Sequence, residues 1–107
     1  MSKDTDKNIK YTNLDTSYYV YILKCSDGTL YTGITNDLKR RLDMHNSGVA
    51  SKYTKSRLPV SYVYIESGLN KSNELKRESA IKKLSKTAKL DLIADPSANE
   101  FNGSLPC

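Results

Sequence analysis

The feature that most constrains the fold is a pair of segments rich in aromatic and β-branched residues, 18–24 and 29–34, with Ser26-Asp27-Gly28 between them. Residues of these types favour β-strands. Asp-Gly between two such runs is a strong hairpin signal, because glycine accepts the positive φ that a primed turn requires. The sequence therefore predicts a β-hairpin. Gly33, inside the second strand, marks a bulge or a place where another backbone or a ligand comes close.

A short helix is predicted directly after the hairpin, over residues 36–46. Thr35 or Asn36 can cap its N-terminus, and Asp37 then lies in the first turn, where a negative charge is favourable. Gly48 offers a left-handed end to the helix.

This helix carries two polar side chains at the edge of its apolar face. At about 100° per residue, Leu38, Leu42 and His45 share that face, and Arg41 lies next to His45. For the helix taken alone, the commoner interpretation is an arginine whose stem covers the rim and a buried histidine with satisfied hydrogen bonds. The alternative is that both side chains belong to a functional site.

Three more elements complete the expected fold. Residues 60–66 are rich in valine, tyrosine and isoleucine and predict a third strand. Residues 70–84 predict a second helix, and residues 86–93 a last short one. The predicted fold class is α+β, a small three-stranded, mostly antiparallel sheet flanked by helices.

The 107 residues fit one small domain, which we place at residues 17–93. Residues 1–16 are expected to form a flexible arm and residues 94–107 a flexible tail, because both are polar. Neither a signal peptide nor a membrane-spanning run is recognised, so we expect a cytoplasmic protein without membrane contact. Cys25 and Cys107 form neither a disulfide framework nor a metal-ligand pair.

The positive charge is concentrated in the predicted domain. The chain has a net charge of +5, but residues 17–93 hold fourteen basic against seven acidic side chains, a net +7. This balance is typical of a domain that binds phosphate groups. A merely soluble basic surface is the alternative.

The predicted loop over residues 49–59 gathers several basic side chains around one aromatic ring. Lys52, Lys55 and Arg57 can neutralise phosphates, and Tyr53 can stack or hydrogen-bond. We interpret the loop as a nucleic-acid contact, with a solvated connector as the alternative.

A glutamate lies in the predicted inward arc of the second helix. The arc is defined by three apolar residues (Leu75, Ile81 and Leu84), and Glu78 falls between the first two. A carboxylate in such a place needs a counter-charge or a metal ion. An ion pair with Arg41 is one explanation, and a metal ligand is the other. Glu74, one turn earlier, is the competing carboxylate and is less central in the arc.

Tyr21, Tyr31 and Arg41 are spaced ten residues apart, and on these residues the chain resembles the GIY-YIG endonuclease superfamily. Its two signature tripeptides correspond to Tyr19-Val20-Tyr21 and Tyr31-Thr32-Gly33, where the tyrosines and Gly33 match. The nearest likeness is to small stand-alone URI-type bacterial proteins, which share the VYIL, DG, LYTGIT, RR and KYT elements in this order. The resemblance covers residues 18–93.

The resemblance implies a phosphodiesterase that uses one divalent metal ion. Glu78 would bind Mg²⁺ or Mn²⁺, and Arg41 would stabilise charge on the phosphate. Tyr21 would act as the general base with help from His45, and Tyr31 would orient the water or the phosphate. The single histidine and the lack of paired carboxylates argue against a zinc site or a two-metal site.

One departure concerns the asparagine that many superfamily members carry beyond the glutamate. Asn99 and Asn102 lie in the predicted tail and have no convincing match.

The implied function is a metal-dependent DNA endonuclease, acting in DNA repair or recombination. Since the basic loop offers only phosphate contacts, we expect selectivity for DNA structure (branched, single-stranded or duplex) rather than for sequence. Two alternatives remain: a non-catalytic nucleic-acid-binding module, and a small adaptor domain that needs a protein partner. The presence of all five active-site residue types argues against the first (Tyr21, Tyr31, Arg41, His45 and Glu78). The sequence leaves the oligomeric state open.

Overall fold

The computed structural model describes residues 17–68 and 70–103. The predicted arm, residues 1–16, lies outside this range, as do residues 104–107 of the predicted tail. The elements follow in the order β2 (Tyr18–Lys24), β3 (Leu30–Thr35), α2 (Leu38–Asn46), α3 (Lys52–Lys55), β4 (Ser61–Gly68), α4 (Lys71–Lys82) and α5 (Lys86–Ala94). None of the helices within the described residues is long and apolar enough to cross a membrane.

The three strands form an antiparallel sheet in the order β3-β2-β4. Tyr21, at the middle of the central strand, lies opposite Gly33 of β3 and Ile65 of β4. The register with β4 shifts between Ile22 and Leu23. The predicted α+β class, with a three-stranded antiparallel sheet and flanking helices, is confirmed.

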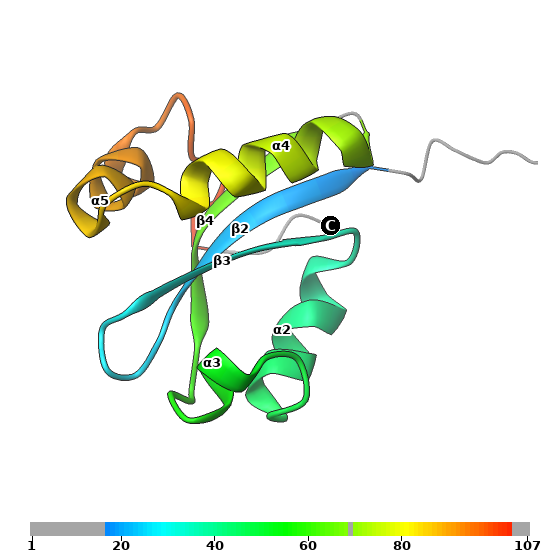
Figure 1. Cartoon of the computed structure of the whole chain (residues 1–107), viewed down its shortest axis with the longest axis vertical. Coiled ribbons are helices and arrows are strands. Elements are labelled where there is room, and N and C mark those ends of the chain that lie inside the picture. Colours follow the sequence, from blue (N-terminus) through cyan, green and yellow to red (C-terminus); the bar gives the residue numbers. More distant parts are fainter. Residues whose placement is uncertain (1–16, 69, 104–107) are drawn as a thin grey trace, which may run out of the picture.

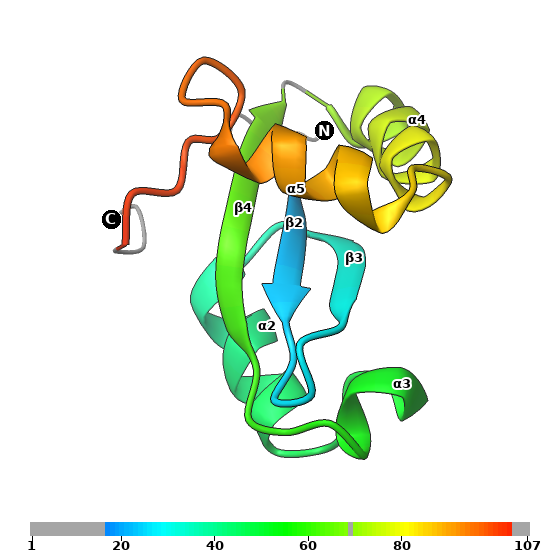
Figure 2. The ribbon, with the colours of Figure 1, turned by 90° about the vertical axis from the view of Figure 1, so that its left-hand side faces the viewer.

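The sheet lies between two helical layers (Figure 1). Helix α4 runs over β2 and β3 on one face, whereas α2 and α3 lie on the other. Helix α5 continues the α4 layer, where Leu92 and Ile93 join the core (Figure 2). The two faces of the sheet are therefore covered by different helices, α4 and α5 on one and α2 and α3 on the other (Figures 1 and 2).

Side-chain alternation along β2 divides the core between the two faces. Tyr21 and Leu23 pack with Leu38 on the α2 side. Val20 and Ile22 pack with Ile81 on the α4 side. Because both faces are covered, the strand carries no alternating polar residues.

The first helix begins two residues later than predicted, and its cap is Asp37 rather than Thr35 or Asn36. The Asp37 carboxylate accepts a hydrogen bond from the Arg40 amide at 3.1 Å, and the Thr35 hydroxyl accepts one from the Asp37 amide at 3.1 Å. A capping carboxylate satisfies a free N–H and also favours the positive end of the helix dipole.

The C-terminal segment corrects an expectation. Residues 94–107 were predicted to form a flexible tail, but the part that the structure describes packs against β4. The Asn99 side chain accepts from the Ile65 amide at 3.2 Å, and the Glu100 amide donates to the Ile65 carbonyl at 2.8 Å. Phe101 lies against Tyr62. The physical reason is that β4 is an edge strand whose free backbone groups need partners.

Candidate active site

The Tyr21 ring lies directly over Gly33, its cross-strand neighbour. A Cβ atom at position 33 would run into the Tyr21 ring and hydroxyl. Gly33 thus leaves the space that lets a large buried side chain lie flat against β3. The close approach at this glycine is made by a tyrosine side chain rather than by the backbone or ligand that the sequence predicted. The sheet's one irregularity in the described residues lies elsewhere, at the extra residue Val63 of β4, opposite the step from Ile22 to Leu23.

Tyr21 begins a buried chain of hydrogen bonds. Its hydroxyl is 2.9 Å from Nε2 of His45, and Nδ1 of His45 is 2.9 Å from Oγ1 of Thr54. The Thr54 hydroxyl in turn donates to the carbonyl of Ser51 at 3.4 Å. Because the Thr54 hydroxyl donates to Ser51, its oxygen accepts a hydrogen bond from Nδ1–H of His45. Nε2 of His45 then carries no proton and accepts a hydrogen bond from the Tyr21 hydroxyl. The three side chains are at most 2% exposed.

The two titratable side chains in this series of hydrogen bonds, Tyr21 and His45, are both neutral near pH 7. Burial raises the pKa of Tyr21 well above its usual value, the nearby Tyr31 adds to the rise, and the Arg41 charge opposes it. Burial lowers the pKa of His45, and Arg41 lowers it further. The site therefore pairs a neutral phenol with a neutral imidazole whose Nε2 can take a proton.

The lowered pKa of His45 predicts a stability change with pH. The unfolded chain gains a proton at about pH 6.5, where folded His45 stays neutral, so stability should fall as the pH decreases from there through the folded pKa. Thermal unfolding measured between pH 7.5 and 5 should show that His45→Gln loses less stability than the parent as the pH decreases. The comparison is needed because Glu74, whose pKa burial raises, changes stability in the opposite direction. Equal losses in both proteins would contradict the assignment.

Tyr31 extends the site toward α3. Its ring centroid is 5.3 Å from that of His45 and 6.5 Å from that of Tyr21. On its outer side it stacks with Tyr53 at 5.9 Å and an interplanar angle of 27°. A row of rings thus leads from the buried Tyr21 to Tyr53, whose side chain reaches the surface.

The basic loop does not present all its cations in the same way. Arg57 lies over the Tyr53 ring at 4.0 Å from the centroid and forms an ion pair with Asp27 at 3.1 Å. It therefore ties the hairpin turn to α3. Lys52 and Lys55, by contrast, are exposed. The segment is also more regular than the predicted loop, since Ser51 caps one helical turn.

Two charged residues act on the Tyr21 pKa from opposite layers of the fold. Arg41, half-buried on α2, lowers it, and Glu78 on α4 raises it. Within the described residues, Glu78 forms an ion pair with Lys82 at 3.3 Å rather than with Arg41. Tyr21, Tyr31 and His45 are thus in contact, and Arg41 and Glu78 lie within electrostatic range of them.

The predicted inward arc of the second helix is confirmed for Ile81, which is 1% exposed, but it is wrong for its other two apolar members. Leu75 and Leu84 are 43% and 39% exposed, whereas Glu74 is only 5% exposed. Glu78 is intermediate, with 15% of its side chain exposed. The helix has too few apolar residues to set its rotation by itself, and packing against β2 and β3 sets it instead.

Glu74 is more buried than Glu78 but faces a different neighbourhood. Its carboxylate lies against Gly68, where a Cβ atom would overlap it. Glu66 and Glu100 are the other carboxylates that act on its pKa. Glu78, not Glu74, is the carboxylate whose charge reaches Tyr21.

A divalent cation at this site would depend on one carboxylate. No group of three or more acidic, histidine or cysteine side chains in the described part of the chain could hold a metal ion. A single, partly exposed carboxylate fits Mg²⁺, which dehydrates reluctantly and keeps several waters, better than ions that need a full protein cage.

Thr54 is the site residue that the sequence did not reveal. It is fully buried and orients His45 from α3. The sequence contained a signal in the KYT element that includes it, but only the tertiary structure shows which side chain faces His45.

Comparison with known proteins gives a consistent result. The family model described as the GIY-YIG catalytic domain matches residues 17–91. A UPF0213 protein of Clostridium perfringens is 51% identical over 78% of this chain and 90% of its own length. One from Syntrophus aciditrophicus is 57% identical over 70% and 87%.

Among solved structures, the NMR structure of the protein EF2693 from E. faecalis is similar, with a TM-score of 0.53. It is 35% identical, over 82% of this chain and 95% of that one. The match to the family model and the identity to small bacterial proteins together show that this chain belongs to the GIY-YIG nuclease family.

Proposed function

We propose that this protein is a metal-dependent DNA endonuclease that hydrolyses phosphodiester bonds. The observation that carries the proposal is the buried chain from Tyr21 through His45 to Thr54, next to Tyr31. A buried phenol can accept a proton from water at neutral pH if it passes its own proton to a neutral imidazole held beside it. Further support comes from Arg41 and Glu78, whose charges act on the same phenol in opposite directions.

In this proposal, Tyr21 is the group that meets the attacking water. As the water attacks phosphorus and the bond from phosphorus to the departing oxygen breaks, the water's proton passes to the Tyr21 oxygen while the Tyr21 proton passes to Nε2 of His45. The departing oxygen takes its proton from solvent. This concerted route avoids a free phenolate, which the raised pKa of Tyr21 makes unfavourable. Because the pKa of His45 is lowered, its proton is readily returned to solvent.

Arg41 supplies positive charge from the α2 side, where its planar fork suits two phosphate oxygens. Glu78 would hold the divalent cation, Mg²⁺ or Mn²⁺, in place of its ion pair with Lys82. When bound, such a cation would neutralise charge on the phosphate and on the departing oxygen. Tyr31 would orient the water or the phosphate between these groups.

The proposed substrate is DNA recognised through its phosphates and its shape. The exposed Lys52 and Lys55 offer contacts to the backbone rather than to base edges. Selectivity for branches, ends or single strands follows, which suits a role in DNA repair or recombination.

The test is cleavage of labelled single-stranded, duplex, flap and four-way-junction DNA with Mg²⁺ or Mn²⁺. The parent should cut at least one substrate, and Glu78→Gln should lower the rate by about 100-fold or more, because a metal ion supplies several kcal/mol to such reactions. The matched control is Glu74→Gln, which removes a more buried carboxylate on the same helix and should keep the activity.

Binding without cutting, equal in the parent and Glu78→Gln, would overturn the proposal. It would instead indicate a nucleic-acid-binding module in which Glu78 only pairs with Lys82. Equal loss in both glutamate variants would mean that the helix, not the metal ligand, is being disturbed.

A further inference from the structure

The start of α5 carries an unfavourable concentration of positive charge. Lys86 and Lys89 lie in and just after its first turn, which contains no acidic residue. Cations are disfavoured at a helix N-terminus, where the dipole is positive and anions are favoured. Within the described residues, neither lysine forms an ion pair. Burial and the nearby Lys82 lower the pKa of Lys89.

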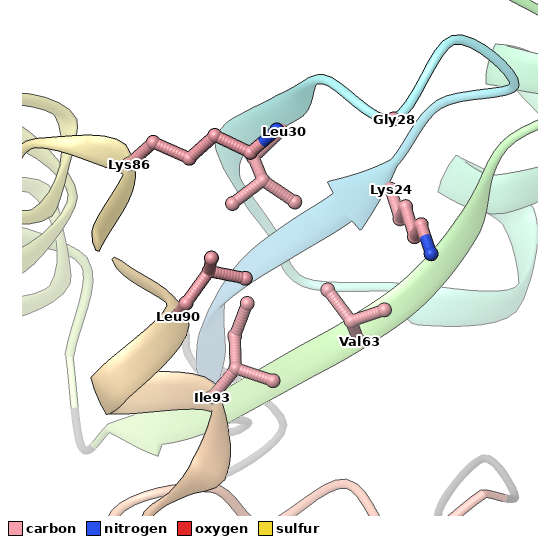
Figure 3. A pocket seen from close by; sticks show the side chains of 7 residues that line it. All are labelled: Lys24, Gly28, Leu30, Val63, Lys86, Leu90 and Ile93. Carbon is pink, nitrogen blue, oxygen red and sulfur yellow. The ribbon is translucent and has the colours of Figure 1, made fainter. Parts of the chain in front are cut away.

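Two adjoining hollows border these lysines and share Leu30 and Lys86. The smaller, of about 230 Å³, also contacts Lys89 and the Tyr53 ring. The larger, of about 440 Å³, has apolar walls from the two layers it separates (Leu30, Val63, Leu90 and Ile93). Figure 3 shows the Lys86 side chain reaching across toward Leu30, with Leu90 and Ile93 facing the strands.

The shape and lining suit a ligand that is apolar on one part and anionic on another. The larger hollow lies within the range of small-molecule sites, ~300–1,000 Å³. Leu90, in the wall of the larger hollow, is 47% exposed, so apolar surface is left uncovered next to Lys86 and Lys89. A nucleotide has this combination, since its base offers an apolar face and its phosphate a negative charge.

Two rows of neighbouring residues lead from the candidate active site toward these hollows. On one side the rings of Tyr21, Tyr31 and Tyr53 form a row that ends at the smaller hollow. On the other side Glu78 forms an ion pair with Lys82, and the charge of Lys82 lowers the pKa of Lys89. A DNA strand lying between the tyrosine rings on one side and these charged residues on the other would pass from the reacting phosphate to the start of α5.

We propose that the surface between β3 and α5 is a binding subsite for an unpaired nucleotide next to the phosphate that is cut. The subsite holds that nucleotide's phosphate between Lys86 and Lys89 and its base against Leu30, Leu90 and Ile93. A base held in a duplex cannot enter the hollow, so the preferred DNA carries a single-stranded segment. This inference rests on the proposed nuclease function and names the substrate class for it.

The test measures binding alone, so that it does not depend on cleavage. Fluorescence anisotropy, with EDTA present, compares a labelled 12-nucleotide single strand with a blunt duplex of the same length. Lys86→Gln/Lys89→Gln should weaken single-strand binding about tenfold and lower the salt slope by about 0.7 for each phosphate that is no longer neutralised. The matched control is Lys71→Gln/Lys76→Gln, with the same charge change on exposed positions of α4.

A second variant tests the place of the base. Leu90→Asp keeps both lysines but puts a negative charge on the apolar wall, and it should weaken the single strand more than the duplex. A 2-aminopurine base in the single strand should change its fluorescence on binding to the parent and less on binding to Leu90→Asp.

Equal weakening by the two double-lysine variants, or no preference for the single strand in the parent, would overturn the subsite. Failure of the nuclease proposal would look different, because the parent and Glu78→Gln would then bind DNA equally without cutting it, while the preference for the single strand and its loss in Lys86→Gln/Lys89→Gln stood.

Discussion

Gly33→Ala is expected to displace the Tyr21 ring and to lower the cleavage rate by about 100-fold. The added Cβ would overlap the phenol, and the ring is buried among the rings of Tyr31, His45 and Tyr62, which leave it little room to move. Forcing atoms into a packed interior costs about 1–3 kcal/mol of stability. A reacting group misplaced by about 1 Å can lose about two orders of magnitude in rate.

The measurement pairs thermal unfolding with cleavage rates. Gly103→Ala is the control, because Gly103 has a φ of 101° and open space around it, so alanine there strains the backbone without touching Tyr21. It should cost about 1–2 kcal/mol and leave the rate unchanged. In a Tyr21→Ala background, Gly33→Ala should lose most of its stability cost, because the overlapping ring is gone. An additive cost would show that the clash is with something other than Tyr21.

Tyr21→Phe is expected to lower the cleavage rate by about 10²–10⁴-fold, the range for loss of a general acid–base group. The ring still fills its place over Gly33, so packing is kept. Nε2 of His45 loses its hydrogen-bond partner while buried, which costs about 1–3 kcal/mol of stability.

Tyr62→Phe is the control that separates the loss of cleavage rate from the loss of stability expected for Tyr21→Phe. The Tyr62 hydroxyl is also buried and donates to the Leu38 carbonyl at 2.6 Å, and its ring packs edge-on against Tyr21 at 5.4 Å. Its loss should destabilise the fold by a similar amount without the fall in rate. If Tyr21→Phe cut DNA at the parental rate, Tyr21 would not be the group that accepts the water's proton.

The local elements were largely predictable. The strands and the Asp-Gly turn follow from β-propensity and from the positive φ at Gly28, which is 86°. Gly48, predicted to end the first helix, has a φ of 80°. These features depend on neighbouring residues only, so periodicity and turn chemistry are sufficient to indicate them.

The candidate site was predictable as residue types but not as an arrangement. The resemblance to the GIY-YIG family pointed to Tyr21, Tyr31 and Arg41, yet the hydrogen bond from Tyr21 to His45 joins residues 24 positions apart. Thr54 lies in the KYT element, but the sequence does not show which side chain of that element faces His45. Whether these residues together cut DNA stays a prediction.

By itself, the sequence determined the hairpin, the order along the chain of every strand and helix except α3, and the family to which the chain belongs. Only the tertiary structure decided how α4 is rotated, with Glu74 buried and Leu75 exposed, and that residues 95–103 cover the edge of β4. The reason is that an element's type depends on its own residues, whereas its rotation and the partners of an edge strand depend on surfaces contributed by distant segments.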